Sequence, residues 1–304
     1  MGVIFEQVFI LFVFAAVGYL LSFFKVVKSE HSKLLSSLLV YVFLPCNIFK
    51  TFLTNFNIDY LKQNYVMVAA SAITVVVIAI ASHFLAKLFS KEPYKRSVYE
   101  YSMIVPNLGY MGYALSESLL GSAGLMNVMM CGLPMTCFTY TRGFCLLTKR
   151  SFTFKKILNP IIVSVLLGVV FGLAGIELPQ TVITVLSKSS ACMAPLSMLL
   201  AGIVVSEFNF KKMFSNIRSY IVVLIRLLII PSLVGGLFML LGQKEIAQSA
   251  VMVFSMPCGL NAIIFPKLIG EDCETGASLA FISTVLSCIT IPLIFTLFGI
   301  GLKL

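Results

Sequence analysis

Long apolar stretches alternate with short charged clusters along the whole 304-residue chain. A helix needs about 20 apolar residues to cross the hydrocarbon core of a membrane, and the stretches come close to that length. The pattern therefore predicts ten membrane-spanning helices. Their expected ranges are 3–24, 33–52, 65–89, 97–118, 125–148, 158–174, 180–206, 217–241, 246–268 and 275–301.

Two prolines and one glycine in the first half of the chain have counterparts of the same residue type half a chain further on. The matched pairs are Pro45 and Pro195, Pro106 and Pro257, and Gly18 and Gly168, at offsets of 150, 151 and 150 residues. A constant offset of half the chain length indicates an internal duplication. We therefore expect a first five-helix repeat over residues 1–152 and a second over residues 153–304.

The composition identifies the solvent that surrounds these helices. Hydrophobic residues make up 59% of the chain, charged residues only 11%, and the mean hydropathy is +1.02. A soluble domain carries about 25% charged residues. The surface of such a chain must therefore face lipid, where helices satisfy their own backbone polar groups. The predicted fold class is an all-α polytopic membrane protein with ten transmembrane helices.

The excess of basic residues, 22 Lys and Arg against 12 Asp and Glu, has two interpretations. It could mark a surface for nucleic acid or acidic lipid, or it could reflect positive cytoplasmic loops. The charges fall between the spans, which favours loops and no nucleic-acid partner. With both termini outside a cytoplasmic membrane, fifteen basic residues fall in cytoplasmic loops and four outside. Five spans in each half then make the second repeat inverted relative to the first.

The fourth and ninth predicted helices carry a proline and a glycine in mid-span, in Val105-Pro106-Asn107-Leu108-Gly109 and Met256-Pro257-Cys258-Gly259-Leu260-Asn261. Proline removes a backbone donor, and glycine lets the chain leave helical geometry. The exposed N-terminus of a half-helix attracts an anion such as a carboxylate. The alternative is two simple kinks whose asparagines tie neighbouring helices together. The matched offset favours a binding site.

Several segments resemble the auxin efflux carrier family, which includes bacterial malate-permease-like transporters. The segment from Val105 to Leu115 looks like the fourth-helix motif of that family, and the segment from Met256 to Pro266 is the strongest match. Similarity also extends through Asn159-Pro160, the segment from Ala194 to Gly202, the segment from Ser283 to Ser287, and Ile291-Pro292. The resemblance covers essentially the whole chain.

The resemblance implies two inverted five-helix repeats whose helices 4 and 9 cross at Pro106 and Pro257. It implies a scaffold of helices 1, 2, 6 and 7 that forms a homodimer, and a transport domain of helices 3–5 and 8–10. The implied substrate-binding residues are Asn107, Gly109, Tyr110, Gly259, Leu260 and Asn261. The chain lacks the long cytoplasmic loop of the long plant carriers, so auxin itself is not singled out as the substrate.

Three basic residues, Arg142, Lys188 and Arg226, fall inside predicted spans, where a charge indicates function by default. Arg226 lies about eight residues into its span, at about 1.5 Å per residue. It could add positive potential to an anion pathway or pair with Glu100 or Glu207. Arg142 is a second candidate for the pathway, with snorkelling to the interface as its alternative. Lys188 fits an interfacial position equally well.

Coupling to Na⁺ or H⁺ stays open at the level of sequence. Asp59 and Asp272 are the two aspartates of the chain, and both are expected in loops. Without a carboxylate at the crossing, direct carboxylate-based proton exchange is not expected. His83 could relay protons or simply face the interface.

Enzyme classes lack the residues they need. The chain has no pair of membrane aspartates, no HExxH motif, and only two histidines. Its eight cysteines include no CxxC pair, so neither a metal centre nor a disulfide framework is expected. The predicted function is secondary transport of a small carboxylate, such as malate or an auxin-like acid, by elevator-type alternating access without a cofactor. The alternatives are an ion-coupled transporter of another small solute, or a channel.

Overall fold

The structure is a computed structural model that describes residues 2–28, 31–149, 160–207, 216–267, 269–271 and 273–300. Within these ranges the chain is helical, as predicted, and forms no strand beyond one isolated bridge. Segments labelled η are π-helical turns. The elements are α1 (Gly2–Phe23), α2 (Ser32–Leu38), η2 (Leu39–Phe43), α3 (Leu44–Asn55), α4 (Ile58–Phe89), α5 (Pro93–Ile104), η3 (Leu108–Gly112), α6 (Tyr113–Phe138), η4 (Thr139–Gly143), α7 (Phe144–Thr148), α8 (Pro160–Leu173), α9 (Gln180–Ser206), α11 (Ile217–Leu224), η6 (Ile225–Ile229), α12 (Ile230–Leu240), α13 (Lys244–Phe254), α14 (Asn261–Lys267) and α15 (Glu274–Leu297). Asn159 and Asp272 lie outside the described residues.

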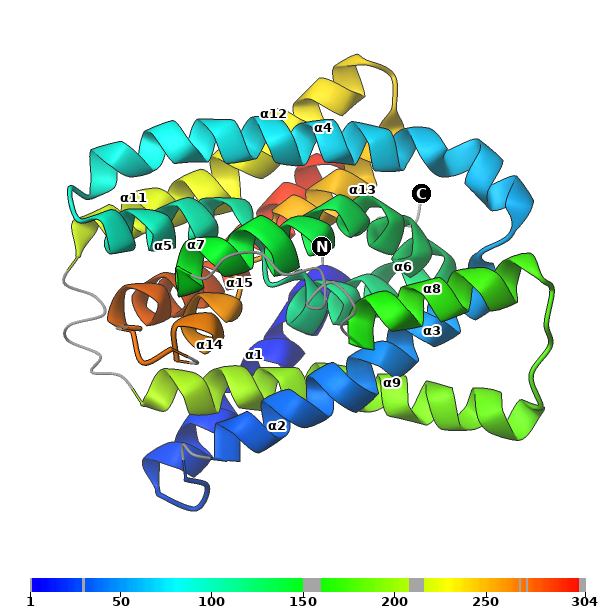
Figure 1. The fold of residues 1–304 in the computed structure, drawn as a ribbon, viewed down its shortest axis with the longest axis horizontal. Coiled ribbons are helices and arrows are strands. Elements are labelled where there is room, and N and C mark those ends of the chain that lie inside the picture. The colour runs from blue at the N-terminus through cyan, green and yellow to red at the C-terminus, as the bar shows by residue number, and fades with distance from the viewer. Residues whose placement is uncertain are drawn as a thin grey trace.

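Seven helices of the described chain are long and apolar enough to cross a membrane. They are Ile4–Phe23, Ser32–Asn55, Ile58–Phe89, Leu108–Thr148, Gln180–Ser206, Ile217–Leu240 and Glu274–Leu297. Large apolar side chains cover their outer faces, among them Phe9, Leu88 and Leu233, each more than 60% exposed. In Figure 1, α4 runs along one edge of the molecule and α9 along the opposite edge. This outward display of apolar surface fits a multi-pass membrane protein.

The helix from Leu108 to Thr148 is bent sharply at Gly121. This glycine has φ 67° and ψ −171°, values outside helical geometry. The positive φ suits glycine, which has no Cβ to clash. The bend falls between the predicted helices 97–118 and 125–148, so the long apolar element Leu108–Thr148 consists of two helical segments.

Both proline segments interrupt the helices around them. Helix α5 ends at Ile104 and η3 begins at Leu108, while α13 ends at Phe254 and α14 begins at Asn261. Proline alone does not cause such a gap here, because Pro195 sits inside the uninterrupted helix α9. The gaps occur where proline is combined with glycine and asparagine.

Helix α1 packs on α9 and α3 packs on α8 through glycines that bring backbones into contact. A Cβ at Gly18 would lie 2.2 Å from the carbonyl oxygen of Leu199, and one at Gly202 would lie 1.9 Å from that of Ala15. On the other side, a Cβ at Gly168 would lie 2.6 Å from the Cβ of Phe52. Small residues at such interfaces let membrane helices approach closely.

We expect Gly18→Ala to destabilise the protein, because α1 and α9 must move apart to admit the methyl group. The expected result is a lower melting temperature in detergent, measured by thermal denaturation followed by size-exclusion chromatography. Gly236→Ala is the matched control, since a Cβ at Gly236 meets no atom within 4 Å. An unchanged melting temperature in Gly18→Ala would contradict the tight backbone contact.

Candidate functional site

The two helix interruptions pair with each other through their backbones. The Asn107 N–H donates to the Pro257 carbonyl at 2.7 Å, and the Gly259 N–H donates to the Val105 carbonyl at 3.1 Å. The two strands of this small bridge run antiparallel. Where one segment leaves helical geometry, some of its backbone N–H and carbonyl groups lose their partners within the helix. The other segment supplies hydrogen-bond partners for them, as the interior of a membrane requires.

A third bond anchors the second interruption to helix α15. The Cys258 N–H donates to Ser283 Oγ at 2.9 Å, and both residues are buried. Gly259, next in the chain, would bring a Cβ within 3.2 Å of the Pro106 carbonyl oxygen. The glycine thus allows the two backbones to pair, and the serine fixes their place against α15.

A cavity of about 50 Å³ lies beside the paired segments and has room for a few water molecules. Its walls hold all six predicted substrate-binding residues together with Pro106, whereas Pro257 contributes only its carbonyl to the backbone pairing. The lining residues are Leu44, Val105, Pro106, Asn107, Leu108, Gly109, Tyr110, Tyr113, Met135, Thr136, Thr139, Tyr140, Ile161, Gly259, Leu260 and Asn261. None of them is charged.

Polar groups converge on this cavity from both halves of the chain. Asn107 is buried, and its Oδ1 has no hydrogen-bond partner among the described residues. Tyr140 and Asn261 both line the cavity, while the buried hydroxyl of Tyr101 has no hydrogen-bond partner among the described residues. The helix that continues from η3 into α6 begins at Leu108, so its positive dipole end lies at the cavity wall. The arrangement places neutral amide and hydroxyl groups and the N-terminal end of a helix around one cavity.

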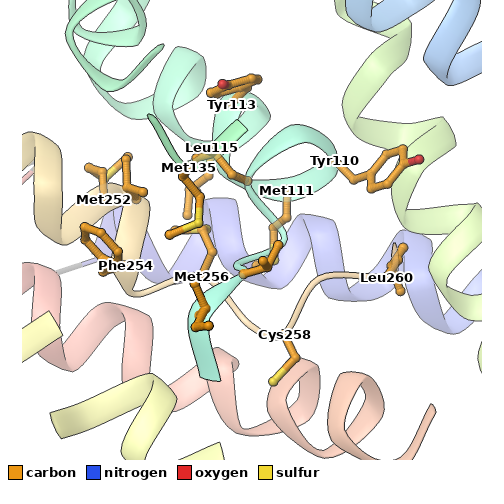
Figure 2. Close-up of a cluster of buried hydrophobic side chains, with 14 of the residues drawn as sticks. Tyr110, Met111, Tyr113, Leu115, Met135, Met252, Phe254, Met256, Cys258 and Leu260 are labelled. Carbon is orange, nitrogen blue, oxygen red and sulfur yellow. The ribbon is translucent and has the colours of Figure 1, made fainter. Parts of the chain in front are cut away.

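Helices α3, α8 and α9 close the other side. Leu44 of α3 and Ile161 of α8 line the cavity. Ser197 of α9 donates its hydroxyl to the carbonyl of Tyr110 at 2.7 Å. Figure 2 shows Tyr110 and Leu260 on the side of the interruptions that faces α9, and Cys258 directed away toward α15.

Leu260 separates the polar cavity from a second, larger one. The second cavity, of about 270 Å³, lies between α1, α9 and α15 and is lined mainly by apolar side chains. Leu260 is 2% exposed and contributes to both cavities. The two cavities therefore share the side chain of Leu260 as part of their linings.

The predicted pathway charges do not line the polar cavity. Arg226 is fully buried in η6 and donates from Nη1 to the Met103 carbonyl at 3.4 Å. Arg142 is exposed at the end of η4, and Lys188 is exposed on α9. Glu100 contacts His83 Nδ1 at 3.0 Å rather than Arg226. Asp59 lies in the first turn of α4.

A polar cluster that the sequence analysis missed joins α3 to α6. Asn47 Nδ2 donates to Glu117 Oε2 at 3.0 Å, and Lys50 Nζ lies 3.6 Å from Glu117 Oε1. The repeat offset could have drawn attention to part of it. Asn47 and Ser197 are 150 residues apart, each follows a matched proline by two positions, and both are completely buried.

Apolar membrane-crossing helices around a small polar cavity, with the backbone unwound at that cavity, are typical of a membrane transport protein. A family model described as "Membrane transport protein" matches residues 3–151 and 135–295. The chain belongs to this family, the auxin efflux carrier family that its motifs resemble.

Two archaeal relatives align over nearly their full length. One, from Methanocaldococcus jannaschii, is 24% identical over 303 residues, covering 95% of this chain and 96% of the relative. The other, from Methanothermobacter thermautotrophicus, is 25% identical over 301 residues with the same coverage. Both are described as uncharacterised transporters. The family and these relatives indicate a transporter and not an enzyme.

We expect Ser283→Ala to cost about 1–3 kcal/mol of stability, because it leaves the buried Cys258 N–H without an acceptor. The control is Ser287→Ala on the same helix, since Ser287 is equally buried and, among the described residues, bonds to the nearby Thr284 carbonyl alone. Thermal denaturation of both variants in detergent tests the difference. Equal melting temperatures would contradict the role of Ser283 as an anchor.

Proposed function

We propose that this protein is a secondary transporter that moves a small organic carboxylate across the cytoplasmic membrane by elevator-type alternating access. The cavity at the paired interruptions carries the proposal, because it combines the N-terminal end of a helix with Asn107 and Asn261. Its described lining contains no acidic residue that would repel an anion. A helix N-terminus favours a carboxylate through its free N–H groups and its dipole.

Glycine packing supports the proposal of ten spans in two inverted repeats, 1–152 and 153–304. A Cβ at Gly18 would meet the backbone of Leu199, and a Cβ at Gly168 would come within 3.3 Å of the Phe49 carbonyl oxygen. Gly168 is Gly18 advanced by 150 residues, and Leu199 is Phe49 advanced by the same number. One contact thus becomes the other when the halves exchange places, as a pseudo-two-fold axis requires.

The same contacts support a division into scaffold and transport domain. All of them join α1, α3, α8 and α9, which correspond to predicted helices 1, 2, 6 and 7. Polar contacts from this group to the unit of α4–α7 and α11–α15 include those of Asn47 and Ser197. A scaffold of tightly packed backbones with few polar ties to its neighbour suits a sliding motion. The proposal includes a homodimer through the scaffold and both termini outside, as expected from the family and the loop charges.

Uptake by proteoliposomes tests the proposed site. Labelled malate and labelled indole-3-acetate serve as dicarboxylate and monocarboxylate probes. We expect Asn107→Ala and Asn261→Ala each to lower uptake about 10- to 100-fold, the effect of losing a hydrogen bond to a charged group. Asn64→Ala is the control, because Asn64 bonds to the Tyr60 carbonyl and does not line the cavity.

Uptake that accelerates when unlabelled substrate is loaded on the opposite side would support a carrier. Unitary conductance in single-channel recordings would instead indicate a channel. Normal uptake in both asparagine variants would contradict the site.

Leu260→Ala should broaden the range of substrates, because it opens the polar cavity to the apolar one beside it. We expect straight-chain monocarboxylates of six to eight carbons to inhibit labelled uptake at least tenfold better in the variant. The gain should be absent for short dicarboxylates, whose second charge would have to enter the apolar compartment. Competition assays with a chain-length series measure this effect, and equal inhibition profiles would contradict the dividing role of Leu260.

A further inference from the structure

The apolar cavity between α1, α9 and α15 lies outside the proposed substrate site. Among the side chains that line its volume of about 270 Å³, only those of Tyr19 and Thr284 carry a polar atom. The Thr284 hydroxyl donates to the Ala280 carbonyl at 2.7 Å, and the Tyr19 ring stacks on that of Phe23. An apolar cavity of about 150 Å³ stays dry and takes up benzene. The larger cavity here is therefore suited to hydrocarbon and not to water.

The rim of this cavity belongs to the outer surface of the helices. Phe12 and Leu20 line the cavity and are 37% and 47% exposed. Beside the outer face of a membrane-spanning helix, the surrounding medium is lipid hydrocarbon. An unfilled apolar cavity leaves its walls without packing partners on one side. An acyl chain supplies those partners and brings no polar group that would need a hydrogen bond.

The cavity follows the second half of α1. Its lining on α1 runs from Phe12 to Leu20, about 12 Å at about 1.5 Å per residue. In the proposed topology this half lies in the cytoplasmic leaflet. The helix ends on that side carry charges of both signs, with Lys25 after α1, Glu207 after α9 and Glu274 in the first turn of α15. The charges therefore select no particular headgroup, and the apolar lining selects the chain.

The walls of the cavity come from both proposed units. Helices α1 and α9 belong to the scaffold, whereas Leu260 and α15 belong to the moving unit. A rigid protein surface seated across this junction would tie the two units together and oppose the sliding motion. A fluid acyl chain fills the same space and adapts when the walls move. This step rests on the proposed elevator motion, and it favours lipid over a second copy of the chain.

We propose that the cavity binds one acyl chain of a cytoplasmic-leaflet phospholipid between the scaffold and the moving unit. The headgroup lies at the end of α1 that Lys25 follows, and the chain runs past Leu20 toward Phe12. Leu260 closes the inner wall, where the polar cavity begins. Lipid binding is measured without any carboxylate flux, so the site can fail while the transporter stands, and the reverse.

Quenching by brominated lipid tests the site. The chain has no tryptophan, so a single introduced tryptophan is its only indole. Phe281→Trp places the indole on the cavity wall, and Leu233→Trp is the control on the lipid-facing surface of α12, outside the cavity. Delipidated protein in detergent is titrated with phosphatidylcholine or phosphatidylglycerol that carries bromine on its acyl chains. We expect quenching of Phe281→Trp to saturate near one lipid per protomer with either headgroup, and quenching of Leu233→Trp to require lipid in excess.

Filling the cavity should displace the lipid. Ala201 lines the cavity, so Ala201→Leu in the Phe281→Trp background adds a side chain where the acyl chain would lie. We expect the lipid concentration for half-maximal quenching to rise at least tenfold. An unchanged concentration in a folded variant would overturn the site.

The two tryptophan reporters alone keep the inference falsifiable if Ala201→Leu does not fold, and Val285→Trp replaces Phe281→Trp if that variant fails. Equal titration curves for the cavity and control reporters would overturn the inference. Absence of quenching at every lipid ratio, or quenching confined to monomers separated by size-exclusion chromatography, would overturn it in favour of an empty cavity or a second copy. A tenfold preference for one headgroup would overturn selection by the chain.

Discussion

Every feature of the polar cavity depends on one requirement, that backbone groups unwound within a membrane find partners in the protein. The two interruptions meet it by bonding to each other, from Asn107 to Pro257 and from Gly259 to Val105. Neither interruption could exist alone without stranding donors and acceptors in an apolar interior. The pairing therefore places residues from both halves of the chain around one small volume. It also fixes the directions in which the positive N-terminal and negative C-terminal ends of the half-helices point.

The position of the interruptions could be read from sequence because proline and glycine act locally. Pro106 and Gly259 mark their segments without reference to any neighbour, and all six predicted binding residues line one cavity. The bend at Gly121 falls in the gap that the apolar pattern left between the expected helices 97–118 and 125–148, although the pattern did not single out this glycine. The Glu117 cluster and the contact between Glu100 and His83 were missed because they depend on which spans become neighbours.

The charged groups follow a common rule, since each described one lies outside the polar cavity. Glu117 is held by Asn47 and Lys50, Glu100 contacts His83, and Arg226 donates to the Met103 carbonyl. The cavity is thereby lined by neutral groups, and under the proposed function these would stabilise an anion without fixing it as firmly as a direct ion pair. A carrier has to release its ligand, and a neutral site makes release easier.

The bond from Ser197 to the Tyr110 carbonyl has a consequence for the rate at which the two units could slide past each other. It joins a helix of the tightly packed group to the first turn beyond the interruption, where the carbonyl already belongs to a π-helical turn with irregular bonding. If the two units slide past each other, this bond has to open together with the contacts from Asn47 and Lys50 to Glu117. Ser197 would then contribute to the energy barrier for that sliding motion.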